Sequence, residues 1–206
     1  MVPPTRSALK IPEWGGKKKK MKIETKEISL AITFSSLYAI LVIFLAPISF
    51  GPIQLRIADC LIPLAALFGW PVIFGVSLGC LVGNAYFWLG PQDVFLGAFA
   101  NLLAATLIFL LRRRQIMGCV IGSLPIGIIV GGYLWIFFPP PDIFGIQLPI
   151  WSAMIISITI STLIAVAGIG YILLRSLEHS SILKVLKSWG LKIYTKNLKK
   201  NFFSFL

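Results

Sequence analysis

The chain has 206 residues, of which 57% are hydrophobic and 13% are charged, with a mean hydropathy of +0.90. A soluble domain is about 45–50% apolar and about 25% charged, so this composition excludes an ordinary soluble domain and indicates one integral membrane domain. The net charge of +12 gathers at the ends of apolar segments, which is typical of membrane proteins and does not predict nucleic-acid binding.

The first 27 residues are expected to form a basic cytoplasmic segment. They hold eight of the 19 Lys and Arg residues and no apolar stretch. The apolar segment that follows is too long for a signal peptide and has no small-residue cleavage site after it. Met21 directly follows the lysine run Lys17–Lys20, so translation starting at Met1 or at Met21 gives the same membrane domain.

Six apolar segments follow, and each is expected to form a helix. Five are long enough to span a membrane, which takes about 20 residues, whereas the second is short and is ended by Gly69 and Pro71. We therefore predict an all-α integral membrane domain over residues 28–174, with six transmembrane helices and a short second helix that packs against protein. The segments are 28–46, 58–70, 72–88, 94–111, 117–137 and 150–174.

The distribution of basic residues predicts the orientation. Six crossings with both termini in the cytoplasm place 18 of the 19 basic residues inside and only Arg56 outside, whereas five crossings would expose the seven basic residues after Leu174. Cytoplasmic loops of membrane proteins are rich in Lys and Arg. We therefore expect a multi-pass protein of the cell membrane with both termini cytoplasmic. Residues 175–206 would be a basic tail, either solvated or forming an amphipathic helix on the anionic inner leaflet.

Charged side chains are rare in the apolar part of the chain. Between Ile28 and Leu111 only Arg56, Asp59 and Asp93 are charged. Ionisable groups near membrane depth are costly and persist where they bind a ligand or pair with each other. The pattern predicts a solute pocket near the outer face, and its alternatives are a structural ion pair and a helix cap. The candidate ligand-binding residues are Gln54, Arg56, Asp59, Asn84, Trp88, Gln92 and Asp93.

Small residues recur at every fourth position of the first apolar segment, at Ala31, Ser35 and Ala39. Such stripes let membrane helices approach closely. The stripe therefore predicts either a docking surface for another membrane protein or packing against the protein's own helices. Trp88 has a similar ambiguity, since it suits stacking on a ligand ring or an interfacial aromatic belt.

Catalytic motifs are missing from the sequence. The single histidine, His179, lies beyond the last apolar segment, and no Ser-His-Asp set, metal-binding motif or phosphate-binding loop is present. We expect no enzymatic activity, no metal site and no cofactor. Energy for active transport would have to come from a partner or from an ion gradient.

Three runs of the sequence occur in order and resemble the QueT family: Phe50–Asp59, Gly79–Asn84 and Asp93–Ala105. The resemblance implies the six-helix fold of a substrate-binding (S) component of an energy-coupling-factor (ECF) transporter. It implies capture of a queuosine precursor, a deazapurine-like small molecule, from outside. It also implies a transmembrane coupling subunit docked on Ala31, Ser35 and Ala39, and two ATPase subunits.

A 7-deazaguanine suits the candidate residues chemically. Its guanine-like edge presents two adjacent N–H donors, which a carboxylate such as Asp59 or Asp93 accepts, and a carbonyl that Arg56, Asn84 or Gln92 can serve. Two alternatives stay open at this point. The chain could be an S component for another vitamin or nucleobase, or an assembly protein of a membrane complex without a transport role.

Overall fold

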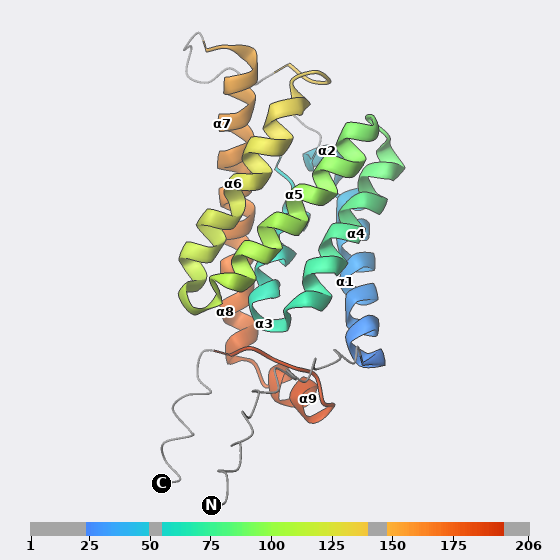
Figure 1. Cartoon of the computed structure of the whole chain (residues 1–206), viewed down its shortest axis with the longest axis vertical. Helices are drawn as coiled ribbons and strands as arrows, with labels where there is room; N and C mark the ends of the chain where they lie inside the picture. Colours follow the sequence, from blue (N-terminus) through green and yellow to red (C-terminus); the bar gives the residue numbers. More distant parts are fainter. Residues whose placement is uncertain (1–23, 50–54, 140–147, 196–206) are drawn as a thin grey trace, which may run out of the picture.

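The computed structural model describes residues 24–49, 55–139 and 148–195, and all regular structure in these ranges is helical. The long helices run side by side along one axis (Figure 1). The prediction of an all-α membrane bundle is confirmed. The elements are α1 (Thr25–Phe44), α2 (Ala46–Ser49), the 3₁₀ helix η1 (Ile57–Leu64), α3 (Ala65–Phe68), α4 (Trp70–Phe87), α5 (Pro91–Leu110), η2 (Arg112–Arg114), α6 (Gln115–Leu134), α7 (Ile150–Thr162), the π-helical η3 (Leu163–Gly170), α8 (Tyr171–His179) and α9 (Ile182–Ser188).

Five helical segments of the described chain are long and apolar enough to cross a membrane, and the protein is a multi-pass membrane protein. Four of them are α1, α4, α5 and the η2–α6 segment. The fifth combines α7, η3 and α8 into one helix over Ile150–His179. This last helix continues five residues beyond the predicted end at Leu174, and its final turn carries an ion pair between Arg175 and Glu178 at 2.7 Å.

The short second helix is buried within the bundle. Residues 57–68 form η1 and α3, and every side chain from Ala58 to Phe68 is buried. They pack against α1, α5, η3 and α8. Gly69 ends the segment at a positive φ of 68°, and Pro71 follows in the first turn of α4. The structure thus agrees with a short helix that is surrounded by protein instead of lipid.

Helices α1 and α4 approach closely because α4 carries a glycine stripe. A Cβ atom on Gly75 would lie 2.7 Å from the carbonyl oxygen of Ala31, and one on Gly79 would lie 2.5 Å from that of Ser35. Gly83 continues the stripe one turn later. Small residues at this period allow backbone-to-backbone packing in a membrane.

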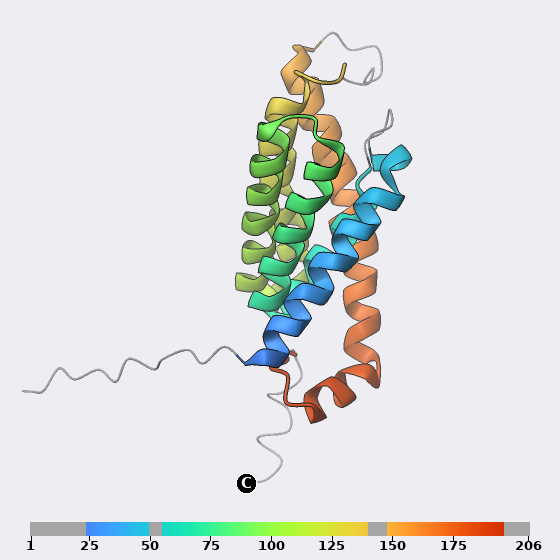
Figure 2. The ribbon, with the colours of Figure 1, turned by 90° about the vertical axis from the view of Figure 1, so that its right-hand side faces the viewer.

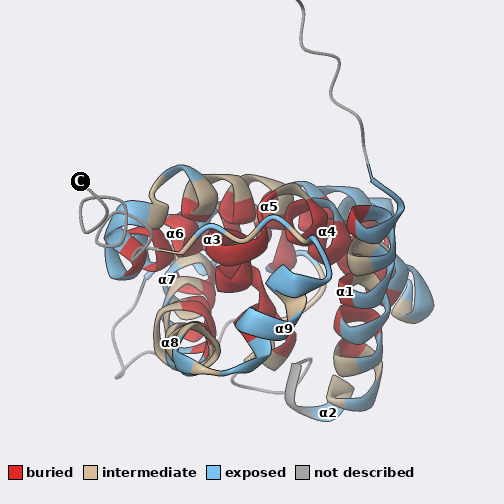
Figure 3. Cartoon of the chain, turned by 90° about the horizontal axis from the view of Figure 1, so that it is seen from below, coloured by how far each residue is buried: buried red, intermediate tan, exposed pale blue. Residues whose placement is uncertain are grey.

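The described chain begins and ends at the same end of the bundle. Figure 1 and Figure 2 show the start of α1 beside α9, while α2 and the start of α7 lie at the opposite end. From residue 55 onward, η1 and α3 bring the chain back towards the end where α1 begins (Figure 1). Buried residues face the bundle axis, and exposed ones cover its outer surface and α9 (Figure 3).

Candidate functional site

Four polar side chains form a buried ring of hydrogen bonds, here named the inner cluster: Tyr38, Arg56, Asp59 and Asn101. The hydroxyl of Tyr38 and the Nε of Arg56 both donate to Oδ1 of Asp59, the latter over 3.1 Å. Arg56 Nη2 donates to Oδ1 of Asn101 over 3.3 Å. Asn101 Nδ2 then donates to the Tyr38 hydroxyl over 2.8 Å, which closes the ring.

The inner cluster joins three elements that are far apart in the sequence. Tyr38 comes from the middle of α1 and Asn101 from the middle of α5, whereas Asp59 lies in the first turn of η1 and Arg56 precedes it. The Arg56 and Asp59 side chains are 14% and 2% exposed. No buried side-chain N or O atom of this cluster lacks a hydrogen-bond partner. The ring therefore holds η1 between α1 and α5, and the use of Arg56 and Asp59 by a ligand stays a prediction.

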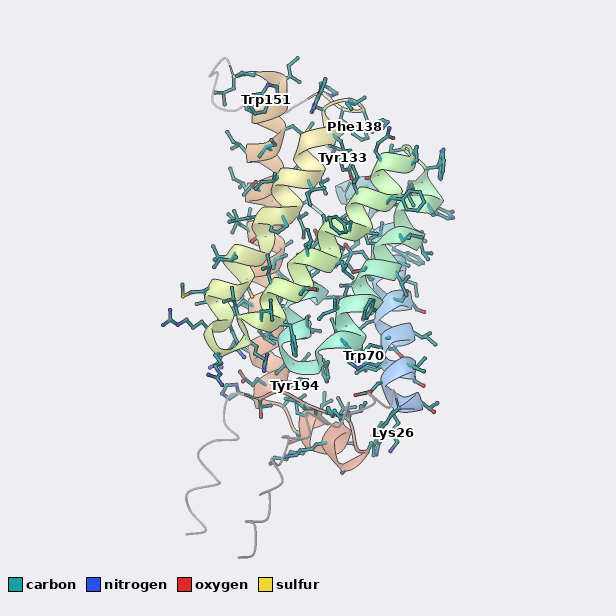
Figure 4. All side chains as sticks on the ribbon, in the orientation of Figure 1. Lys26, Trp70, Tyr133, Phe138, Trp151 and Tyr194 are labelled. Atoms are coloured by element: carbon teal, nitrogen blue, oxygen red, sulfur yellow. The ribbon has the colours of Figure 1, made fainter. Side chains whose placement is uncertain are left out.

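A second set of polar side chains, the outer cluster, consists of Asn84, Asp93 and Tyr133. Asn84 lies in the last turn of α4, Asp93 in the first turn of α5 and Tyr133 near the end of α6. All three are buried. Tyr133 donates to Oδ1 of Asp93 over 2.8 Å, and Asn84 Nδ2 donates to the backbone carbonyl of Asp93 over 2.9 Å. Tyr133 lies towards the end of the bundle opposite Lys26 (Figure 4).

Two acceptor atoms of the outer cluster have no partner. They are the second carboxylate oxygen of Asp93, Oδ2, and the amide oxygen of Asn84, Oδ1. A buried acceptor without a hydrogen bond costs about 1–3 kcal/mol, and a charged one costs more. Arg56 acts electrostatically on Asp93, but its side chain donates hydrogen bonds to Asp59 and Asn101. The outer cluster therefore offers a carboxylate oxygen and an amide oxygen to a ligand that donates hydrogen bonds.

The absence of a side chain at Gly97 leaves room for the outer cluster. Asp93, Gly97 and Asn101 follow one another at intervals of four residues, so they share one face of α5. A Cβ atom on Gly97 would lie 2.6 Å from Nδ2 of Asn84 and 3.5 Å from the hydroxyl of Tyr133. The same face of α5 thus carries one member of each cluster, with the glycine between them.

The structure brings some of the candidate ligand-binding residues together and separates others. Arg56 and Asp59 share the inner cluster, and Asn84 and Asp93 share the outer cluster. Gln92 is exposed, and Trp88 is 62% exposed at the end of α4, where it has a left-handed backbone. Neither belongs to a cluster. Gln54 lies outside the described residues.

The predicted docking stripe lies along the edge of the contact between α1 and α4. Ala31 and Ser35 are partly buried and Ala39 is buried. The carbonyl oxygens of Ala31 and Ser35 face the glycines of α4. The stripe thus takes part in packing within the protein, and its use by a second protein stays a prediction.

Two tyrosines of the clusters were not among the predicted site residues. Tyr38 and Tyr133 each donate to a buried carboxylate, in the inner and the outer cluster respectively. Tyrosine is enriched at membrane interfaces, where its hydroxyl meets water. Tyr38 instead occupies the middle of an apolar segment, and that position is a sequence signal for a buried hydroxyl that needs a partner. Tyr133 has no comparable signal.

Comparisons with known proteins were consistent with one another. The family model described as QueT transporter matches residues 28–179. The chain is 33% identical over 97 residues to the queuosine precursor transporter QueT of Lactococcus lactis subsp. cremoris. This match covers 45% of the chain and 55% of that protein, so it spans about half the length of the relative. No solved structure matches the chain.

Proposed function

This chain belongs to the QueT transporter family, and we propose that it is the S component of an ECF transporter that captures a queuosine precursor of the 7-deazaguanine class. The observation that carries the proposal is the pair of unpartnered buried acceptors, Asp93 Oδ2 and Asn84 Oδ1. A ligand that fits them has to present hydrogen-bond donors. The queuosine precursor transporter of Lactococcus lactis supports the choice of ligand class.

A 7-deazaguanine meets this requirement with its guanine-like edge. The ring N–H and the exocyclic amino group are adjacent donors, and a carboxylate accepts such donors strongly because it is charged. In the proposed complex Asp93 Oδ2 accepts one of these donors and Asn84 Oδ1 accepts another. Tyr133 holds the carboxylate of Asp93 from its other oxygen, which restricts the direction from which the ligand binds.

The proposed orientation places the outer cluster near the outer surface and both termini in the cytoplasm. It is supported by the basic residues, 18 of which fall on one side in a six-crossing topology. It is also supported by the position of the three outer-cluster residues at the end of the bundle away from α9. Substrate would then reach the outer cluster from outside the cell.

The proposed partners are a transmembrane coupling subunit and two ATPase subunits, which would supply the energy for uptake. We place the coupling subunit on the stripe of Ala31, Ser35 and Ala39. Because Ala39 is buried, the sharper test changes Ser35, which is partly buried on the stripe. Ser35→Leu should abolish co-purification of the coupling subunit, whereas Ser36→Leu on the exposed side of α1 should retain it. Equal co-purification by both variants would remove the stripe from docking.

Calorimetry on the detergent-purified protein tests the proposed ligand class. We expect 7-cyano-7-deazaguanine or 7-aminomethyl-7-deazaguanine to bind, and guanine to bind more weakly. Binding of another vitamin or nucleobase, but of neither deazaguanine, would retain an S component and change its substrate. If a folded sample bound none of these and co-purified with an unrelated complex, an assembly role would replace transport.

A further inference from the structure

The last described residues fold back across one end of the bundle and are attached to it. We name residues 182–195 the clasp. It comprises α9 and the irregular segment that follows it. The backbone N–H of Tyr194 donates to the carbonyl of Leu67 over 2.8 Å, and its ring packs edge-on against Phe109 at 5.1 Å. The guanidinium of Arg112 lies 4.5 Å from the Phe109 ring centre and 5.3 Å from that of Tyr194.

A second set of contacts attaches the clasp to the start of α1. Lys26 Nζ donates to the carbonyl of Trp189 over 2.6 Å, and Lys192 pairs with Glu27 at 3.6 Å. Figure 3 shows α9 crossing beneath the bundle, and Figure 4 shows Lys26 and Tyr194 at this same end. The clasp is therefore held at the level where α1 begins, which is where a membrane helix leaves the hydrocarbon region.

One side of α9 and the residue after it form an exposed apolar stripe. Ile182 and Val185 of α9 are 55% and 47% exposed, and Trp189, which caps the helix, is 62% exposed on the same side. Leu183, on another face, is buried against the rest of the protein. Since Leu183 already packs α9 against the protein, the exposed stripe is free to contact a surface outside the protein.

The charge around this stripe is positive. Lys184 and Lys187 are exposed on the side of α9 away from the stripe. The sequence has no acidic residue after Glu178, whereas six lysines follow it. An apolar face combined with lysines on the opposite face is typical of helices that lie in the interface of anionic membranes.

A groove of about 270 Å³ runs between α1 and the clasp, close to the stripe. Leu30, Leu186, Leu191 and Trp189 line it together with Ser29, Thr33 and Lys26, whose Nζ is hydrogen-bonded to the carbonyl of Trp189. Both hydroxyls donate to backbone carbonyls of α1, Ser29 over 3.1 Å and Thr33 over 2.9 Å. Their hydrogen bonds are thus met inside the helix, and the groove offers an apolar surface that suits a lipid acyl chain.

We propose that the clasp is a docking element for anionic phospholipid of the cytoplasmic leaflet. The stripe of Ile182, Val185 and Trp189 inserts among the acyl chains, and Lys184 and Lys187 interact with the acidic headgroups. The assignment to the cytoplasmic leaflet rests on the orientation proposed above. Attraction of the lysines is electrostatic, so docking weakens when salt is raised.

Hydrogen–deuterium exchange of the full chain in lipid nanodiscs tests this proposal. We expect amides of residues 182–189 to exchange about tenfold more slowly in phosphatidylglycerol than in phosphatidylcholine, because each lysine near an anionic surface is favourable. Lys184→Glu combined with Lys187→Glu should remove the difference. Arg113→Glu combined with Arg114→Glu makes the same charge change at exposed positions of η2 and should retain it.

Equal exchange of α9 in the two lipids would overturn the proposal. Slow exchange of α9 that developed only after addition of a coupling subunit would also overturn it, because the stripe would then bind a protein instead of lipid. Both leaflets of a nanodisc have the same composition, so the result does not depend on orientation. Substrate binding measured on the same nanodiscs reports on the proposed function separately from lipid docking.

Discussion

The inner and outer clusters contain the same kinds of side chain but differ in how their hydrogen bonds are met. Each has a buried carboxylate that accepts from a tyrosine, and each has an asparagine. In the inner cluster Asp59 also has the guanidinium of Arg56, and the ring is closed. In the outer cluster Asp93 and Asn84 each keep one buried oxygen without a partner.

We propose that this difference separates residues that hold the fold from residues available to a ligand. Closed polar networks fix the elements that contribute to them, whereas an unpaired buried acceptor is costly and persists where function requires it. The inner cluster fastens η1 to α1 and α5, and the outer cluster retains acceptors at the end of α4 and α5. Changes in the first should therefore lower stability, and changes in the second should lower affinity for substrate.

Removing the inner carboxylate should have the largest effect on stability. Asp59→Ala leaves the largely buried guanidinium of Arg56 without its counter-ion and the Tyr38 hydroxyl without its acceptor. Breaking a buried ion pair from one side costs about 3–5 kcal/mol, so we expect a large fall in melting temperature in detergent. Asp59→Asn retains an acceptor for Tyr38 and should lose less. An Asp59→Ala protein as stable as the wild type would contradict a structural role for the ring.

Filling the space at Gly97 should disturb the outer cluster without adding or removing a polar group. A methyl group there lies 2.6 Å from the Asn84 amide nitrogen and has to displace it. We expect Gly97→Ala to weaken substrate binding about tenfold, because the misplaced amide loses its bond to Asp93. Gly132→Ala is the matched control, since nothing lies within 4 Å of the added carbon. Calorimetry that finds the two variants equal would argue against Asn84 as a ligand contact.

Paired tyrosine variants should produce the smallest and most selective effects. Tyr133→Phe removes the donor that orients Asp93, and we expect binding to fall about fivefold, as for one hydrogen bond of about 1 kcal/mol. Tyr38→Phe removes the equivalent hydroxyl from the inner cluster and should lower the melting temperature while leaving affinity near that of the wild type. The reverse pattern would exchange the roles of the two clusters.

The fold could be predicted from the sequence to a large extent because apolar length determines where a chain crosses a membrane. The short second helix followed from Gly69 and Pro71, and the structure shows it buried. The contact of α1 with α4 could also have been predicted, because Gly75, Gly79 and Gly83 repeat at the same interval as Ala31 and Ser35. The sequence analysis predicted the stripe on α1 but did not assign the glycine stripe of α4 as its packing partner.

Less of the candidate site could be predicted from the sequence. The sequence indicates that polar residues lie near helix ends, but it does not show which side chains they contact. Arg56 with Asp59 was an expected alternative because the two are three residues apart. The approach of Asn84 to Asp93 depends on the turn between α4 and α5, and Tyr133 reaches Asp93 from 40 residues further along the chain. The same turn gives Trp88 a left-handed backbone and an exposed side chain, which no spacing rule predicted.

The assignment of the outer cluster as the binding site is tested most directly by Asp93→Asn. The measurement is the affinity of this variant and of the wild type for 7-cyano- and 7-aminomethyl-7-deazaguanine. The substitution retains the size of the side chain and removes the charge that is proposed to receive the ligand's donors. We expect affinity to fall about a hundredfold, because hydrogen bonds to a charged group are worth about 1.5–3 kcal/mol, while the melting temperature stays the same or rises. Unchanged affinity for a ligand that the wild type binds would contradict the assignment of the outer cluster as the binding site.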